Sequence, residues 1–268
     1  MTHHDNTLPR GNQTLSARVA FAALLTMLAS LALAPRCALA WDWSWGGKGV
    51  SASGTVKTET RDVSGFNAIA VSLPATVTIK QGSKEGLTVE ADDNFLPLIE
   101  TVVDGKTLRI KTKENNVSFR GKFKINITVE AIDVERLSVA GSGDVVAAQL
   151  KTPKLKASIA GSGDVKIERL ETASLDVSIA GSGNFSSGGK ADAMEVSIAG
   201  SGDVRTGKLE TNKASVRISG SGDATVWAKQ SLSVRVAGSG DVKYYGDPTV
   251  STSIAGSGSA KRLGAAPV

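Results

Sequence analysis

Residues Ala140-Gly141-Ser142-Gly143-Asp144-Val145 form a motif that returns, with small changes, through the second half of this 268-residue chain. The opening glycine of each Gly-Ser-Gly stands at Gly141, Gly161, Gly181, Gly200, Gly220, Gly238 and Gly256. Successive copies are therefore 20, 20, 19, 20, 18 and 18 residues apart. A period of this size predicts stacked structural units, which bury a core only by packing on one another.

Apolar and polar residues alternate on both sides of each motif. Val139, Ile159 and Ile179 stand two residues before an opening glycine, and Val145 and Val165 stand four residues after one. A period of two with β-branched residues is typical of half-buried strands. It excludes a helical solenoid, whose apolar period is 3.6. Each repeat therefore predicts a strand, a glycine corner, a second strand and a return loop.

Stacked in register, these repeats predict an all-β fold, a parallel β-solenoid of about 18–20 residues per coil with Gly-Ser-Gly turns. Seven coils about 4.8 Å apart would extend roughly 34 Å. Glycine suits the corners because it adopts positive φ without steric cost. The predicted turn residues are Gly141, Gly143, Asp144, Gly161, Gly163, Asp164, Gly181, Gly183, Asn184, Gly200, Gly202, Asp203, Gly220, Gly222, Asp223, Gly238, Gly240 and Asp241.

The acidic residue after each corner is expected to bond the backbone of its own turn. Stacked carboxylates repel, at a cost of about 0.9 kcal/mol per pair in water. Asn184 interrupts the column, and basic residues such as Lys166 and Arg205 follow two positions later. Calcium binding is the alternative role, but Ca²⁺ takes six to eight oxygen ligands and each coil offers one carboxylate. Turn capping is the favoured interpretation, and no cofactor or metal is expected.

Residues 56–135 lack the glycine corner but still alternate. The segments 66–71, 75–79 and 123–130 read as strands, and 102–110 as a hairpin on an Asp-Gly turn. Residues 92–97 are expected to form a short helical turn. This part is expected to begin the solenoid and cap its end, since an open end exposes strand edges. The predicted solenoid spans residues 56–250, with glycine repeats over 136–263, a Trp/Gly-rich flexible leader over 41–55 and a tail over 264–268.

The first 40 residues are typical of a secretory signal peptide. Arg10 and Arg18 precede an apolar run, and Ala38-Leu39-Ala40 offers a cleavage site. An uncleaved anchor is the alternative, although the run is shorter than the roughly 20 residues of a spanning helix. We therefore expect export to the periplasm or cell surface of a bacterium, with no integral membrane segment after cleavage.

Cleavage would remove every Cys and His of the chain, which are Cys37, His3 and His4. Disulfides, thiolate or imidazole zinc sites and a Ser-His-Asp triad are then excluded. The net charge is +5 for the whole chain, and without three Arg and one Asp it is +3. Basic residues are interleaved with acidic ones, so a nucleic-acid partner is not expected.

Trp227 and Tyr245 stand seven residues past successive corners. If the alternation holds, both point outward on neighbouring coils and could hold a sugar ring or a partner protein. Packing under the leader or the tail is the alternative role. Catalysis would need a carboxylate cluster outside the turn column, for example Glu168 or Glu171 in a cleft. The nearly uniform repeats leave little room for such a cleft.

Three short segments before the repeats are similar to one bacterial family. They are Arg61-Asp62-Val63-Ser64-Gly65-Phe66, Val77-Thr78-Ile79-Lys80-Gln81-Gly82 and Val89-Glu90-Ala91-Asp92-Asp93-Asn94. With the glycine repeats, they resemble the putative auto-transporter adhesin, head GIN domain, over residues 61–245. The resemblance implies a single-stranded right-handed β-helix without the catalytic residues of pectin-lyase-like enzymes, and it suggests adhesion. No C-terminal membrane anchor is expected after Val250.

Together these features predict a non-catalytic exported solenoid that presents a binding surface, as an adhesin-like or envelope-associated module. The expected partner is a glycan or protein at the cell surface. A carbohydrate-active enzyme and a self-associating structural protein of the envelope, a homo-oligomer, remain the alternatives.

Overall fold

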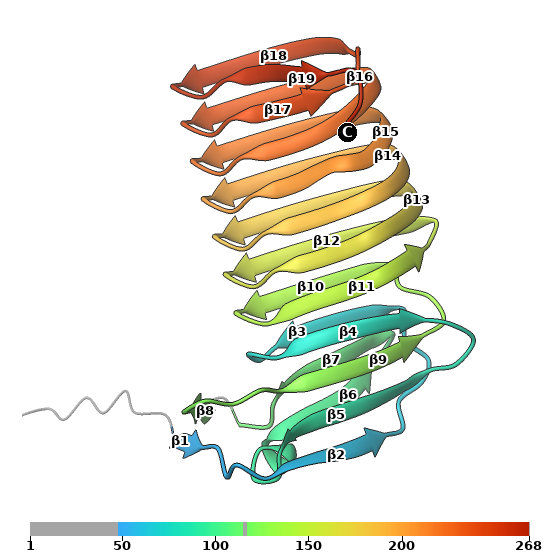
Figure 1. The fold of residues 1–268 in the computed structure, drawn as a ribbon, viewed down its shortest axis with the longest axis vertical. Coiled ribbons are helices and arrows are strands. Elements are labelled where there is room, and N and C mark those ends of the chain that lie inside the picture. The colour runs from blue at the N-terminus through green and yellow to red at the C-terminus, as the bar shows by residue number, and fades with distance from the viewer. Residues whose placement is uncertain (1–47, 115–116, 268) are drawn as a thin grey trace, which may run out of the picture. The chain divides into compact units, whose positions relative to one another are not determined.

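The computed structural model describes residues 48–114 and 117–267. The predicted signal peptide and residues 41–47 of the predicted leader lie outside the described residues. The described part is built from strands, with one short 3₁₀ turn, and it belongs to one compact unit. Figure 1 shows these strands stacked as coils, which confirms the all-β solenoid.

The glycine repeats form the regular part of the stack. Its strands are β10 (Arg136–Gly141), β11 (Asp144–Lys151), β12 (Lys154–Gly161), β13 (Val165–Gly181), β14 (Phe185–Gly200), β15 (Val204–Gly220), β16 (Ala224–Gly238), β17 (Val242–Tyr245), β18 (Thr249–Gly256) and β19 (Ala260–Gly264). The first half of β13 pairs with β11, whereas its second half pairs with β12. The long strands β13 to β16 therefore bend from one sheet into the other. We call the strands before the glycine corners sheet 1 and those after them sheet 2.

Parallel pairing keeps equivalent residues of successive coils in register. Ile159 pairs with Ile179, and Gly161 pairs with Gly181. The inward side chains form one continuous core between the sheets, with Val177 and Phe185 fully buried. The alternation in the sequence thus places every second side chain of a strand inside the coil.

The corners need glycine for two reasons. Gly200 has a φ of +133°, which side chains rarely allow. A Cβ at Gly202, whose φ is not positive, would instead overlap the carbonyl oxygen of Gly183 in the coil below. The backbones of successive corners are therefore in direct contact, and glycine is required for space as well as for conformation.

The acidic column makes a different hydrogen bond from the one expected. Oδ1 of Asp203 accepts from the backbone N–H of Asp223, which is the equivalent residue of the next coil, at 3.1 Å. The same bond recurs along the column, and Asn184 takes part in it through Oδ1. The prediction of a bond within each turn was wrong, because the register of the stack brings the corner N–H of the next coil within hydrogen-bond distance of each carboxylate. Arg205 pairs with Asp203 at 2.8 Å, as expected, whereas Lys166 pairs with Glu168.

The N-terminal strands continue the stack in a different chain order. They are β1 (Lys48–Ser51), β2 (Val56–Arg61), β3 (Ala68–Ser72), β4 (Thr76–Gln81), β5 (Gly86–Asp92), β6 (Ile99–Asp104), β7 (Thr107–Thr112), β8 (Val117–Arg120) and β9 (Asn126–Ala131), with a 3₁₀ turn at η1 (Leu96–Leu98). β3 and β4 pair in parallel with β10 and β11 on one side and with β7 and β9 on the other. The layer of β3 and β4 therefore lies between the layer of β7 and β9 and that of β10 and β11, although β3 and β4 come earlier in the sequence than all of these strands. The helical turn falls later than predicted, and β1 lies within the expected leader.

Antiparallel strands close this end of the stack. β6 pairs with β7 in the predicted hairpin, while β5 pairs with both β2 and β9. Phe95 is fully buried, and its ring centroid lies 4.7 Å from that of Phe119 and 5.6 Å from that of Phe123. These rings cover the end of the core, so the interior of the first layer is shielded from water.

Candidate functional site

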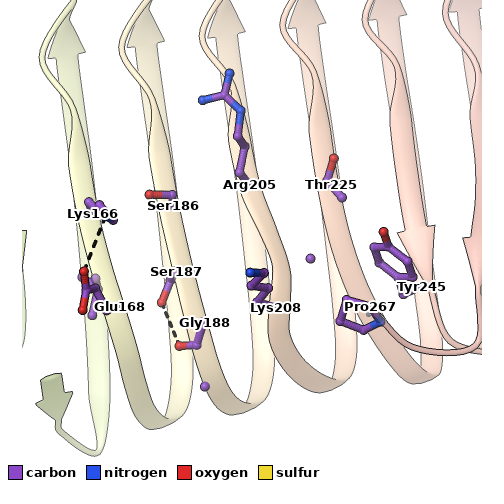
Figure 2. Close-up of a pocket in the computed structure, with 13 residues that line it drawn as sticks. Lys166, Glu168, Ser186, Ser187, Gly188, Arg205, Lys208, Thr225, Tyr245 and Pro267 are labelled. Atoms are coloured by element: carbon purple, nitrogen blue, oxygen red, sulfur yellow. Dashed lines mark hydrogen bonds and ion pairs between the residues drawn. The ribbon is translucent and has the colours of Figure 1, made fainter. Parts of the chain in front are cut away.

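A groove opens on the outer face of sheet 2 where the coils change length. Thr206 of β15 pairs with Val226 of β16, but the next pair is Glu210 with Trp227. Residues 207–209 therefore have no counterpart in the shorter coil. A similar shift separates β13 from β14. The resulting groove has a volume of about 650 Å³ and crosses β13 to β17 (Figure 2).

Three of the residues that line the groove have no side chain. They are Gly188, Gly189 and Gly207. A Cβ at Gly207 would lie 3.0 Å from Cγ2 of Thr225 and 3.3 Å from Cε2 of Tyr245, so the tyrosine ring lies over this glycine. Figure 2 shows Pro267 of the C-terminal tail beside the same ring.

A row of polar side chains crosses the groove. Lys166, Ser186, Arg205 and Thr225 occupy one register position on four successive strands. Because alternate residues of a strand point to opposite faces, and their neighbours Val165 and Ile167 are buried, this row points outward. All four residues line the groove, which combines hydroxyl groups with positive charge (Figure 2).

The charges of the groove do not cancel. Nζ of Lys166 lies 3.5 Å from a carboxylate oxygen of Glu168, and Arg205 is paired with Asp203 beside the groove. Lys208 is exposed and has no ion-pair partner among the described residues. Two of the three basic lining side chains are thus ion-paired, and the charge of Lys208 makes the groove suited to an anionic group.

The two aromatic residues predicted as a ligand surface are neighbours with different surroundings. Trp227 and Tyr245 pair in register on β16 and β17, and both are half-buried. Tyr245 lines the groove, whereas Trp227 does not. The indole Cδ1 of Trp227 lies 3.5 Å from where a Cβ of Gly246 would stand. A ligand in the groove would therefore touch the tyrosine and leave the tryptophan outside.

The acidic residues named for a catalytic alternative lie apart. Glu168 is the one carboxylate that lines the groove, and Glu171 pairs with Lys151 at 3.2 Å beside a different depression. Glycoside hydrolysis ordinarily uses two carboxylates across the scissile bond. Within the described residues, no group of three or more acidic, His or Cys side chains is placed to hold a metal ion. The groove therefore offers binding groups rather than a carboxylate pair.

The groove itself was not predicted from the sequence. Its signal is the shortening of the repeat from 20 to 19 and 18 residues, together with Gly188 and Gly207 at outward positions. The spacing shows that a coil is shorter but not where the residues are missing, which depends on the pairing between β15 and β16.

These features define a parallel β-solenoid with a lateral basic groove, and the family is shown by comparison. The family model of the putative auto-transporter adhesin, head GIN domain, matches residues 65–248, and the chain belongs to this family. The predicted resemblance is confirmed. The family's name points to the cell surface or envelope, and no helix within the described residues is long and apolar enough to cross a bilayer. No protein with a curated description matches the sequence.

Solved structures share the fold over most of the chain. A putative adhesin from Bacteroides fragilis is 29% identical with a TM-score of 0.75, covering 80% of this chain and 100% of that one. A putative lipid binding protein from Parabacteroides distasonis is 26% identical with a TM-score of 0.70, covering 81% and 100%. A putative adhesin from Parabacteroides merdae, 20% identical with a TM-score of 0.63 over 80% and 99%, supports the fold alone.

Proposed function

We propose that this protein is an exported, non-catalytic adhesin-type module of the cell envelope whose groove binds an acidic glycan. The observation that supports this most is the juxtaposition of Tyr245 with the outward row of Lys166, Ser186, Arg205 and Thr225 in one groove. Membership of the adhesin family agrees with a binding role.

The chemistry of the groove matches a saccharide. A tyrosine ring offers an apolar face and a polar hydroxyl, which suits the C–H face and hydroxyl rim of a sugar ring. Ser186 and Thr225 add hydroxyl groups that both donate and accept hydrogen bonds.

The basic residues add a preference for negative charge and for a long ligand. The outward row continues past the groove to Lys243 and Lys261, so that Lys166, Arg205, Lys243 and Lys261 share one register column. Lys166, Arg205 and Lys243 stand two coils apart, about 10 Å. An extended polyanion that lies across the coils would meet a positive charge at regular intervals. A uronate-containing or sulfated polysaccharide has this character.

A glycan array with the purified protein tests the proposal. We expect binding to acidic glycans over matched neutral ones. Tyr245→Ala and Lys208→Gln should each weaken binding at least five-fold, while Lys156→Gln on sheet 1 should leave it unchanged. Because salt screens exposed charges, binding should also weaken as the salt concentration rises. Equal binding of neutral glycans, or insensitivity to both groove variants, would contradict the proposal.

Vesicles with an anionic lipid form a second arm of the same experiment. One structural relative is named as a putative lipid binding protein, and a lipid headgroup can share the negative charge of an acidic glycan. Binding to vesicles that depends on Lys208, with no binding to glycans, would replace the glycan by a headgroup. Glycan binding without vesicle binding supports the proposal as stated.

A further inference from the structure

The two ends of the solenoid are built differently. The N-terminal end is closed by antiparallel strands and the Phe95 cluster. At the other end, within the described residues, β18 pairs only with β16 and β19 only with β17. The outer edges of both strands therefore present backbone N–H and C=O groups without strand partners. Such an edge is a template for pairing with another chain.

The last coil also leaves core positions uncovered. Val250 and Ile254 pair in register with Leu232 and Val236, which are 1% and 3% exposed. Val250 and Ile254 are 37% and 36% exposed, although they continue the same inward columns. All eight residues of β18 are exposed. The last coil thus has apolar residues at the same inward positions as the buried coils, but no further coil covers them within the described residues.

The edge of β18 lacks the protection found at the opposite end. β18 reads Thr-Val-Ser-Thr-Ser-Ile-Ala-Gly, with neither a charged residue nor proline. By contrast, β2 carries Lys57, Glu59 and Arg61, and charged edges discourage pairing. The C-terminal tail does not shield β18, because Pro267 lies in the groove beside Tyr245 (Figure 2).

We propose that the C-terminal coil docks on the same coil of a second copy, with β18 antiparallel to β18 of the partner about a two-fold axis. An axis through Thr252 places Val250 opposite Ile254 of the partner subunit. Apolar side chains then meet across the interface, and each edge gains a ladder of hydrogen bonds. A two-fold contact is self-complementary and closes at two subunits.

The charges of the N-terminal end explain why we expect the second copy to dock through its C-terminal coil and not through its N-terminal end. Head-to-tail stacking would bring uncharged β18 against the charged cap, where the ion pairs Lys57–Asp93 and Arg61–Glu59 would lose water. Such a contact would also propagate into a filament. The contrast between the charged edge of β2 and the uncharged edge of β18 therefore favours a closed dimer of two solenoids joined at their last coils.

Light scattering after size exclusion tests the dimer on the full chain. We expect twice the 27.6 kDa chain mass at micromolar concentration, and Thr252→Lys should reduce it to one chain mass because two lysines meet on the axis. Ser251→Lys on the outer face of the same strand is the matched control and should remain dimeric. Circular dichroism of Thr252→Lys should match the native protein, since Thr252 is exposed in the single chain.

Disulfide trapping reports the geometry independently. In a Cys37→Ser background, Thr252→Cys should oxidise to a covalent dimer, whereas Ser257→Cys beyond the end of β18 should not. A native protein that stays monomeric at micromolar concentration would overturn the proposal. So would a dimer that survives Thr252→Lys, or mass that grows with concentration as in head-to-tail stacking.

Discussion

Oδ1 of Asp223 accepts a hydrogen bond from the backbone N–H of Asp241, one coil further along, at 2.9 Å. Each corner N–H would otherwise have no strand partner, because the chain turns out of the sheet there. The column of acidic residues therefore works as a ladder between coils. Because Asn184 takes the same place without a charge, we expect the acceptor oxygen to matter more than the negative charge.

Substitutions at Asp223 separate the acceptor from the charge. Asp223→Asn should unfold at the same denaturant concentration as the native protein or a higher one, since Asn184 already fills this ladder through its Oδ1. Asp223→Ala leaves the Asp241 N–H without its acceptor and should cost about 1–2 kcal/mol. Urea unfolding measures both. Equal loss in the two variants would show that the charge, and not the acceptor, matters.

Gly202→Ala should destabilise the solenoid by about 3 kcal/mol, because the added methyl group overlaps the carbonyl oxygen of Gly183. The φ of Gly202 is not positive, so the cost reports on space alone. Gly82→Ala is the control, since a Cβ there meets no atom within 4 Å. Thermal unfolding of both variants gives the comparison, and a stable Gly202→Ala protein would mean that successive corners are further apart.

Phe95→Ala should remove about 3–5 kcal/mol of stability from the N-terminal cap, because the ring is fully buried against Phe119 and Phe123. Stacked coils contact mainly their neighbours, so the effect should be local. Hydrogen exchange is expected to quicken in β6 to β9 and to stay unchanged in β15 and β16. Uniform quickening along the whole stack would contradict local coupling.

Ser53 sets the ionisation of Asp93. Its hydroxyl donates to Oδ1 at 2.7 Å and, with Lys57 at 3.4 Å, holds the pKa of Asp93 below its ordinary value of 3.8. Because the folded pKa is lowered, this contribution to stability is present above about pH 4 and is lost as the pH falls through the folded pKa. Ser53→Ala should raise the pKa of Asp93 in an NMR titration, whereas Ser51→Ala should not.

The fold could be predicted because its signals are local and repeated. Seven copies of one motif, with apolar residues at fixed offsets, leave little choice besides stacked coils in register. The order of the N-terminal layers could not be read in the same way. β3 and β7 have the same alternation, and nothing in it shows that β7 lies beneath β3 while β10 lies above.

The ladder and the groove depend on distances between coils. The partner of Asp223 lies 18 residues away in the sequence and is set by the register of the stack. The groove arises where residues 207–209 bulge past the shorter β16. Tyr245 could be named from its outward position, but its contact with Gly207 two coils away required the three-dimensional structure.

Chemical-shift mapping with an oligogalacturonate as the acidic glycan tests the central claim most directly. The account predicts saturable shifts of the backbone amides of Ser186, Arg205, Lys208, Thr225 and Tyr245, with few changes in β2 to β7, and their loss in Tyr245→Ala. Saturable shifts confined to sheet 1 or to the N-terminal cap would contradict the proposed groove, and the absence of shifts with this and other acidic oligosaccharides would contradict glycan binding.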